Sequence, residues 1–139
     1  MNPRALELQQ RTQKFATEVI KFCQTLTNDA ICQEIVEQLS DAAGATDSNY
    51  RATCRARSPD EFIAKVGVAA EEADESKGWL ELLVQSGFTT EESARALIQE
   101  ADELTAIFVA SRKTAERRKA ERERLRRQML ESKRGRRRK

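Results

Sequence analysis

Basic side chains dominate the last 29 residues of this 139-residue chain and offer its clearest chemistry. Fifteen Lys and Arg residues follow position 110, against four Glu residues, so this segment carries a net charge of +11. Lys and Arg at such density bind phosphate backbones by releasing condensed counterions. We therefore predict a nucleic-acid-binding tail over residues 113–139, with Arg112 just before it. The candidate contacts are Arg112, Lys113, Arg117, Arg118, Lys119, Arg122, Arg124, Arg126, Arg127, Lys133, Arg134, Arg136, Arg137, Arg138 and Lys139.

Two other interpretations account for the same charge. In the first, the tail docks on an acidic protein. In the second, it is a solvated helix end that only aids solubility. The clustering exceeds what solubility requires, so nucleic acid is favoured and an acidic protein partner comes second. The tail has no aromatic residue, so base stacking is absent and the sequence preference should be weak.

The rest of the composition excludes most catalytic chemistry. The chain has no His, which removes imidazole bases, Ser-His-Asp and Cys-His pairs, and zinc sites that need His. Glu71, Glu72, Asp74 and Glu75 resemble metal ligands, but di-metal sites in helical bundles use Glu-x-x-His motifs. We expect a solvated or salt-bridged acidic face there. No catalytic residue, metal site or cofactor is predicted.

Cysteine usage and hydropathy predict a cytoplasmic protein with no membrane partner. Cys23, Cys32 and Cys54 are odd in number and lack Cys-x-x-Cys spacing, so reduced thiols are expected. No apolar run reaches the roughly 18–20 residues that span a bilayer, and no signal-peptide pattern opens the chain.

The elements that must position the tail are helices. Residues 1–110 hold 10 basic and 19 acidic residues, a net charge of −9, and show apolar spacing at helical periods in four segments. Breaks fall at residues 26–29, 58–61 and 86–92. This pattern predicts an all-α, antiparallel up-down four-helix bundle over residues 1–112. The expected caps and turns are Ser58 with Pro59 and Glu61, Gly87, and Thr89 with Glu92.

The third segment carries apolar residues on two sides. Its bundle-facing stripe comprises Phe62, Ile63, Val66, Ala69, Ala70, Ala73, Leu80 and Val84. Val68, Trp79 and Leu82 project about 100–160° away from it at about 100° per residue. A covering loop or scattered exposed apolar residues would explain these three, but an interface with a second subunit is favoured.

Helix-forming composition continues past the apolar pattern. The periodicity stops after Ala110, while Glu and basic residues spaced three or four apart support helix as far as Ser132. We predict that the fourth helix extends as a solvated, fraying helix, with residues 133–139 disordered.

Arg51, Arg55 and Arg57 form a candidate secondary basic patch near the end of the second segment. In one interpretation these residues contact phosphate. In the other they pair with Asp60, Glu61 or other acidic residues of the third segment. Structural pairing is the favoured interpretation.

Six blocks of sequence resemble, in their residues and in their order, those of a known protein family. They are Gln38-Leu39, Asn49-Tyr50-Arg51-Ala52, Cys54-Arg55-Ala56-Arg57-Ser58, Phe62-Ile63-Ala64-Lys65, Glu71-Glu72-Ala73-Asp74-Glu75-Ser76 and Trp79-Leu80-Glu81-Leu82-Leu83. Roughly residues 8–112 resemble the bacterial four-helix bundle proteins known from intervening sequences in 23S rRNA genes. That group is related to the accessory variability determinant of diversity-generating retroelements.

The resemblance implies a left-handed bundle that assembles as a ring-shaped homopentamer without known catalytic activity. The retroelement accessory proteins bind nucleic acid and a reverse transcriptase through basic surfaces, so the resemblance favours RNA and makes a reverse transcriptase a candidate partner. This chain departs from the pattern at Ser40-Asp41 and in its acidic residues 1–110. A basic bundle wall therefore does not carry over, and any affinity for nucleic acid must come mainly from the tail.

Overall fold

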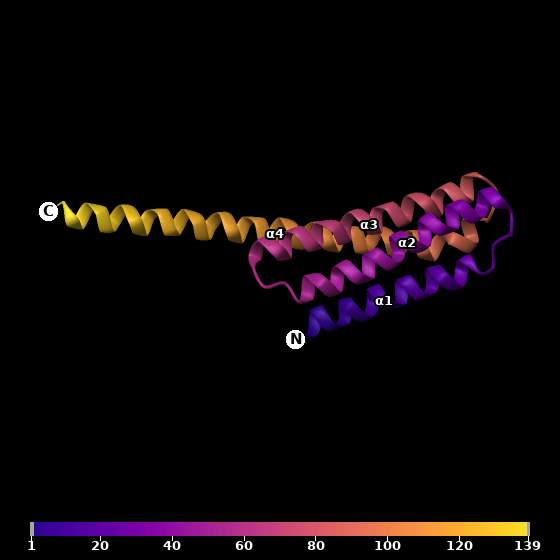
Figure 1. Cartoon of the computed structure of the whole chain (residues 1–139), viewed down its shortest axis with the longest axis horizontal. Coiled ribbons are helices and arrows are strands. Elements are labelled where there is room, and N and C mark those ends of the chain that lie inside the picture. The colour runs from indigo at the N-terminus through magenta and orange to yellow at the C-terminus, as the bar shows by residue number, and fades with distance from the viewer. Residues whose placement is uncertain (1, 139) are drawn as a thin grey trace.

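Four α-helices account for nearly all of the chain. The computed structural model describes residues 2–138, and within that range there is no β-strand. The helices are α1 (Pro3–Cys23), α2 (Ala30–Cys54), α3 (Pro59–Gln85) and α4 (Glu91–Arg137) (Figure 1). Helix α2 packs on α1 and α3, α4 packs on α3, and α1 and α4 complete the bundle. This arrangement confirms the predicted all-α four-helix bundle.

The helix boundaries follow the turn and cap signals. The Ser58 hydroxyl accepts a hydrogen bond from the Glu61 amide at 3.1 Å, and Pro59 begins α3, as predicted. Gly87, at φ +80°, takes the left-handed conformation expected after α3. The predicted cap at Thr89 is wrong by one residue: Thr90 has extended backbone, and its hydroxyl accepts from the Ser93 amide at 3.1 Å.

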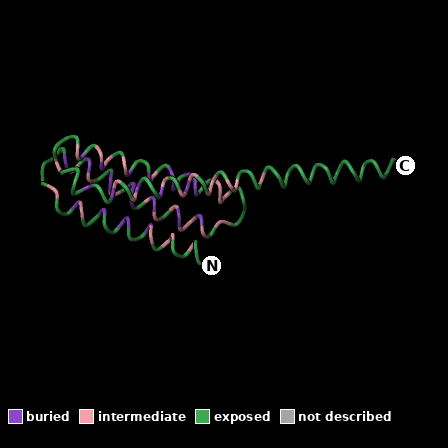
Figure 2. The backbone as a smooth tube through the Cα atoms, turned by 180° about the vertical axis from the view of Figure 1, so that it is seen from behind, coloured by how far each residue is buried: buried purple, intermediate pink, exposed green. Residues whose placement is uncertain are grey.

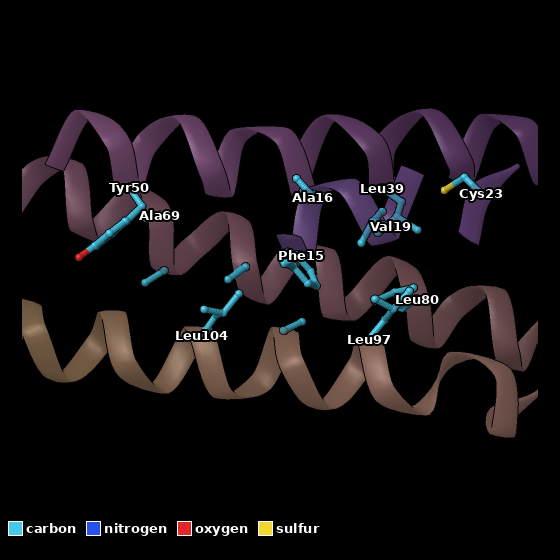
Figure 3. Packing of buried hydrophobic residues seen from close by; sticks show 14 of the residues in the cluster. Phe15, Ala16, Val19, Cys23, Leu39, Tyr50, Ala69, Leu80, Leu97 and Leu104 are labelled. Atoms are coloured by element: carbon cyan, nitrogen blue, oxygen red, sulfur yellow. The ribbon is translucent and has the colours of Figure 1, made fainter. Parts of the chain in front are cut away.

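The core runs along the bundle axis, with contributions from all four helices (Figure 3). Tyr50 of α2 stacks on Phe108 of α4, with ring centroids 5.2 Å apart. On α3, five residues of the predicted stripe, from Val66 to Leu80, are buried, but Leu83 is fully buried in the position expected for Val84. Small buried residues let α2 and α3 approach closely, namely Ala42, Ala43, Ala69, Ala70 and Ala73.

Helix α4 continues far beyond its partners. Every residue from 120 to 138 is exposed, and Figure 2 shows this part as a single helix projecting from the bundle. Helix persists to Arg137, although the sequence predicted disorder from Lys133. Gly135 costs about 1 kcal/mol of helix propensity, and no Pro follows to block the helix. Lys139 lies outside the described residues.

No helix among residues 2–138 combines the length and the apolar character needed to cross a bilayer.

Candidate nucleic-acid interface

The basic segment leaves the bundle beside the first turn of α3. We call residues 113–138 the arm and residues 2–112 the body. The Lys119 ammonium lies 2.6 Å from an Asp60 carboxylate oxygen, and this hydrogen bond and charge raise the pKa of Lys119. An open cleft of about 490 Å³ lies between α3 and the base of the arm. Its lining residues are Asp60, Ile63, Ala64, Glu116, Lys119, Ala120 and Glu123.

Arg112 packs against the body at the point where the arm begins. The side chain runs over Gly67 of α3, where a Cβ atom would lie 3.6 Å from Arg112 Cδ, at ordinary van der Waals distance. Its Nε atom lies 3.8 Å from a Glu116 carboxylate oxygen. Arg112 and Lys119 are therefore engaged with nearby groups, and they hold the base of the arm.

The remaining arm cations point into solvent. Every residue from 120 to 138 is exposed, and the arm projects from the bundle as a single helix (Figures 1 and 2). Arg124 lies 3.9 Å from Glu121, which is a weak pair between exposed groups. The Arg117 guanidinium donates a hydrogen bond to the Thr114 hydroxyl at 3.3 Å. Residues 113–137 thus form one continuous basic helix, where the sequence predicted a helix followed by a disordered end.

In the candidate secondary basic patch, two of the three Arg residues lie next to carboxylates. Arg51 pairs with Asp47 at 2.9 Å, and Asp47 also accepts a hydrogen bond from the Thr12 hydroxyl at 3.0 Å. Arg57 lies 3.7 Å from Glu61, with its side chain 89% exposed. The partner of Arg51 is in its own helix rather than in α3, because Asp47 lies one turn before it. Arg55 is exposed.

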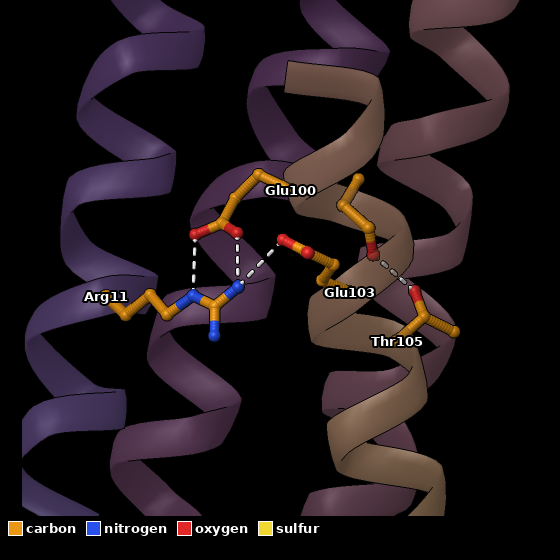
Figure 4. A network of polar contacts seen from close by, with 5 residues as sticks. Arg11, Glu100, Glu103 and Thr105 are labelled. Atoms are coloured by element: carbon orange, nitrogen blue, oxygen red, sulfur yellow. Dashed lines mark hydrogen bonds and ion pairs between the residues drawn. The ribbon is translucent and has the colours of Figure 1, made fainter. Parts of the chain in front are cut away.

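A network of ion pairs joins α1 to α4. The Arg11 guanidinium donates to both carboxylate oxygens of Glu100, at 2.9 and 2.6 Å, and to Glu103 at 3.1 Å (Figure 4). These carboxylates raise the pKa of Arg11, chiefly through the Glu100 hydrogen bond. The sequence does not reveal this bridge, because 89 residues separate Arg11 from Glu100 and no local spacing links them.

The outer face of α3 is acidic and partly apolar. Val68 and Leu82 are 37% and 38% exposed, as the stripe predicted, whereas Trp79 is half-buried and donates its indole N–H to Glu75 at 3.1 Å. Partial burial, with the nearby Glu75 and Glu71, raises the pKa of Glu72. Across residues 2–138, His, Cys, Asp and Glu side chains nowhere gather in threes as a metal site requires.

The three cysteines are free thiols, as predicted. Cys23 and Cys32 are buried, and that burial raises the pKa of both thiols, while Cys54 is half-buried. Buried, protonated thiols are poor nucleophiles, so Cys23 and Cys32 contribute to packing.

Comparison with known proteins identifies the body. The chain is similar in fold to the crystal structure of a protein with unknown function from the S23 ribosomal protein family of Bacteroides thetaiotaomicron VPI-5482. The TM-score is 0.68 at 24% identity, and the match covers 76% of this chain and 97% of that one. A search of the curated proteins found no match. The family model described as 23S rRNA-intervening sequence protein matches residues 4–110, so the arm lies beyond the match. The chain therefore belongs to the 23S rRNA-intervening sequence protein family.

Proposed function

We propose that this protein is a non-enzymatic, oligomeric nucleic-acid-binding protein that holds phosphate backbones with its arm. The observation that carries the proposal is charge separation. Residues 1–110 have a net charge of −9, whereas residues 111–139 have a net charge of +11 and lie mostly on an exposed helix. Cations held away from an acidic body are free to displace counterions from a polyanion. Binding is independent of sequence, because the arm has no aromatic platform.

The assembly and the kind of nucleic acid rest on the family resemblance. A homopentamer in the cytoplasm would join five arms on one particle, and multivalency would raise the avidity without any new contact. The resemblance to retroelement accessory proteins favours RNA and makes a reverse transcriptase a candidate partner. The exposed apolar side chains Val68 and Leu82, together with Trp79, are the proposed subunit interface.

Deletion of residues 113–139 tests the proposal. The truncated protein should lose binding to labelled RNA, while circular dichroism and light scattering show an intact helical oligomer. Arg11, the α3 caps and the core all lie within the retained residues, so the bundle has no reason to unfold. RNA affinity that survives the deletion would show that the arm is not the binding element.

A second candidate is an interaction module whose arm docks on an acidic protein. The observation in its favour is three exposed large apolar residues on the arm, Leu125, Met129 and Leu130 at 48%, 62% and 51% exposure, which phosphate contacts do not require. If the full-length protein has no affinity for RNA even at low salt, this candidate replaces the first. Pull-down with an immobilised arm peptide would then identify the partner.

A further inference from the structure

One side of the arm carries cations and apolar residues without any carboxylate. Counted at about 100° per residue, six residues fall within about 80° of one another around the helix axis. We call this set the front face, and it comprises Arg118, Arg122, Leu125, Met129, Lys133 and Arg136. The two apolar residues lie in the middle, with two cations before them and two after. All six are exposed.

The opposite side of the arm has a net charge of only +1. Glu116, Glu123 and Glu131 lie about 125–205° from the centre of the front face. Glu116 and Glu123 line the cleft beside α3, so the front face points away from the body. Four cations share this side with the three carboxylates, namely Lys113, Arg127, Arg134 and Arg138.

Further cations flank the front face on one side. Arg126 and Arg137 lie about 60–85° to that side. On the other side Glu121 lies about 75° away, and Arg117 and Arg124 lie about 115–140° away, behind the widest part of the helix. All four Arg residues are exposed, and a guanidinium at the end of a long side chain reaches forward past the helix surface. The forward half of the arm therefore presents cations on the front face and on the flank of Arg126 and Arg137, whereas its other flank carries Glu121.

Resting on the proposed function, we propose that the arm binds double-stranded nucleic acid in preference to single strands. In this arrangement the helix lies in a groove, with its front face toward the base edges and Arg126 and Arg137 toward one of the two phosphate backbones. An α-helix with side chains is about 10–12 Å across, and the major groove of B-form DNA is about 12 Å wide. The minor groove of A-form RNA is also wide and shallow.

The length of the arm matches a duplex as well. From Arg118 to Arg136 the front face spans about 27 Å at 1.5 Å per residue. A B-form duplex presents about 16 phosphates over that distance, at one charge per 1.7 Å of axis. A single strand would meet only one side of a straight helix, and it would find no aromatic side chain on which to stack its bases.

The fixed base of the arm also favours a rigid target. The ion pair between Lys119 and Asp60 and the packing of Arg112 over Gly67 fix the direction in which the arm leaves the body. A preorganised rod loses little conformational entropy when it enters a preformed groove. Leu125 and Met129 then lie against base edges or sugars, where they exclude water between the two pairs of cations.

Competition between matched probes tests the preference. Full-length protein is titrated, in low salt, with a duplex of about 20 base pairs and with each of its single strands, both as RNA and as DNA. We expect binding to at least one duplex to be about tenfold tighter than to its separate strands. Equal or tighter binding of the single strands would overturn the duplex inference and leave the proposed function standing. Absence of binding to every probe would overturn the proposed function itself.

A pair of charge-matched double variants tests the orientation. R122Q with R136Q removes two charges from the front face, and R127Q with R134Q removes two from the opposite side. Because all four residues are exposed, neither variant should change the fold. We expect the front variant to weaken duplex binding about tenfold and the other about twofold. Equal losses, or a larger loss from the second variant, would contradict the placement of the front face in the groove.

Discussion

Lys119 and Asp60 join the arm to the body through an ion pair of 2.6 Å. Asp60 lies in the first turn of α3, where the helix dipole also stabilises a carboxylate. Arg112 packs over α3 two turns before Lys119, so two contacts on α3 define the base of the arm. The cations that follow are held at a distance from the acidic body, and this separation is what makes them available to a polyanion.

The Asp60→Asn variant should loosen the base of the arm without unfolding the bundle. It removes the charge that holds Lys119, and the exposed pair makes only a small contribution to global stability. We expect amide hydrogen exchange over residues 113–124 to be faster than in the wild type, and exchange in the α2 core to be unchanged. Asp41→Asn, at an exposed position of α2, is the matched control. Unchanged exchange in the arm would mean that the ion pair does not restrain it.

The bundle was predictable because its signals are local. Ser58 with Pro59, and Gly87, mark the ends of helices through their own backbone preferences, and apolar spacing identifies the faces that are buried. Two predicted positions are wrong by one residue, and at both of them the adjacent side chains are chemically alike. Thr89 and Thr90 both suit a cap, and Leu83 and Val84 both suit a core, so only the packed turn and bundle select between them.

The candidate site was predictable in its composition and less so in its contacts. The charge of the arm is evident in the sequence, but the partners of Lys119 and Arg11 are 59 and 89 residues away and depend on how the helices pack. Disorder after Lys133 was expected from composition, whereas the structure continues the helix to Arg137. The front face required a continuous helix over this segment before its members could be placed on one side.

The Phe108→Ala variant should destabilise the bundle strongly. Phe108 is fully buried and stacks on Tyr50, so truncation leaves a cavity between α2 and α4. We expect a loss of about 3–5 kcal/mol in the free energy of unfolding, measured in urea. Ile31→Ala, at a position that is 65% exposed, is the control and should change it by less than about 0.5 kcal/mol. A loss of similar size in both variants would contradict the assigned core.

Glu72 gives the stability of the body a dependence on pH. Partial burial and the neighbouring Glu75 and Glu71 raise the pKa of Glu72 above its ordinary value of 4.5. The folded state then holds this proton more tightly than the unfolded chain. The resulting stability is fully present below the unfolded pKa, and it is lost as the pH rises through the folded pKa.

Replacement of Glu72 by Gln should therefore remove this contribution to the pH dependence. Above the folded pKa the variant should be slightly more stable than the wild type, by less than about 1 kcal/mol because solvent screens the site. Urea unfolding between about pH 4 and 8 measures both effects. Glu34→Gln, on the exposed face of α2, is the control with the same loss of charge. If the two variants show the same pH profile, Glu72 has no special role.

The Leu82→Glu variant should break the proposed subunit interface. Leu82 is 38% exposed on the outer face of α3, where a carboxylate would be buried against a neighbouring subunit without a partner. We expect light scattering to report a smaller particle than the wild type, with helical content retained. Ile20→Glu, at a residue of α1 that is 48% exposed, should leave the particle mass unchanged. An unaltered mass for Leu82→Glu would place the interface elsewhere.

The dependence of nucleic-acid affinity on salt tests the central claim most directly, because phosphate neutralisation by the arm requires counterion release. The dissociation constant of the full-length protein for an RNA duplex would be measured from about 50 to 300 mM salt. We expect log Kd to rise with log salt concentration with a slope of about 5 or more, which corresponds to at least five or six phosphate contacts. A slope near zero, or no measurable binding at the lowest salt, would contradict it.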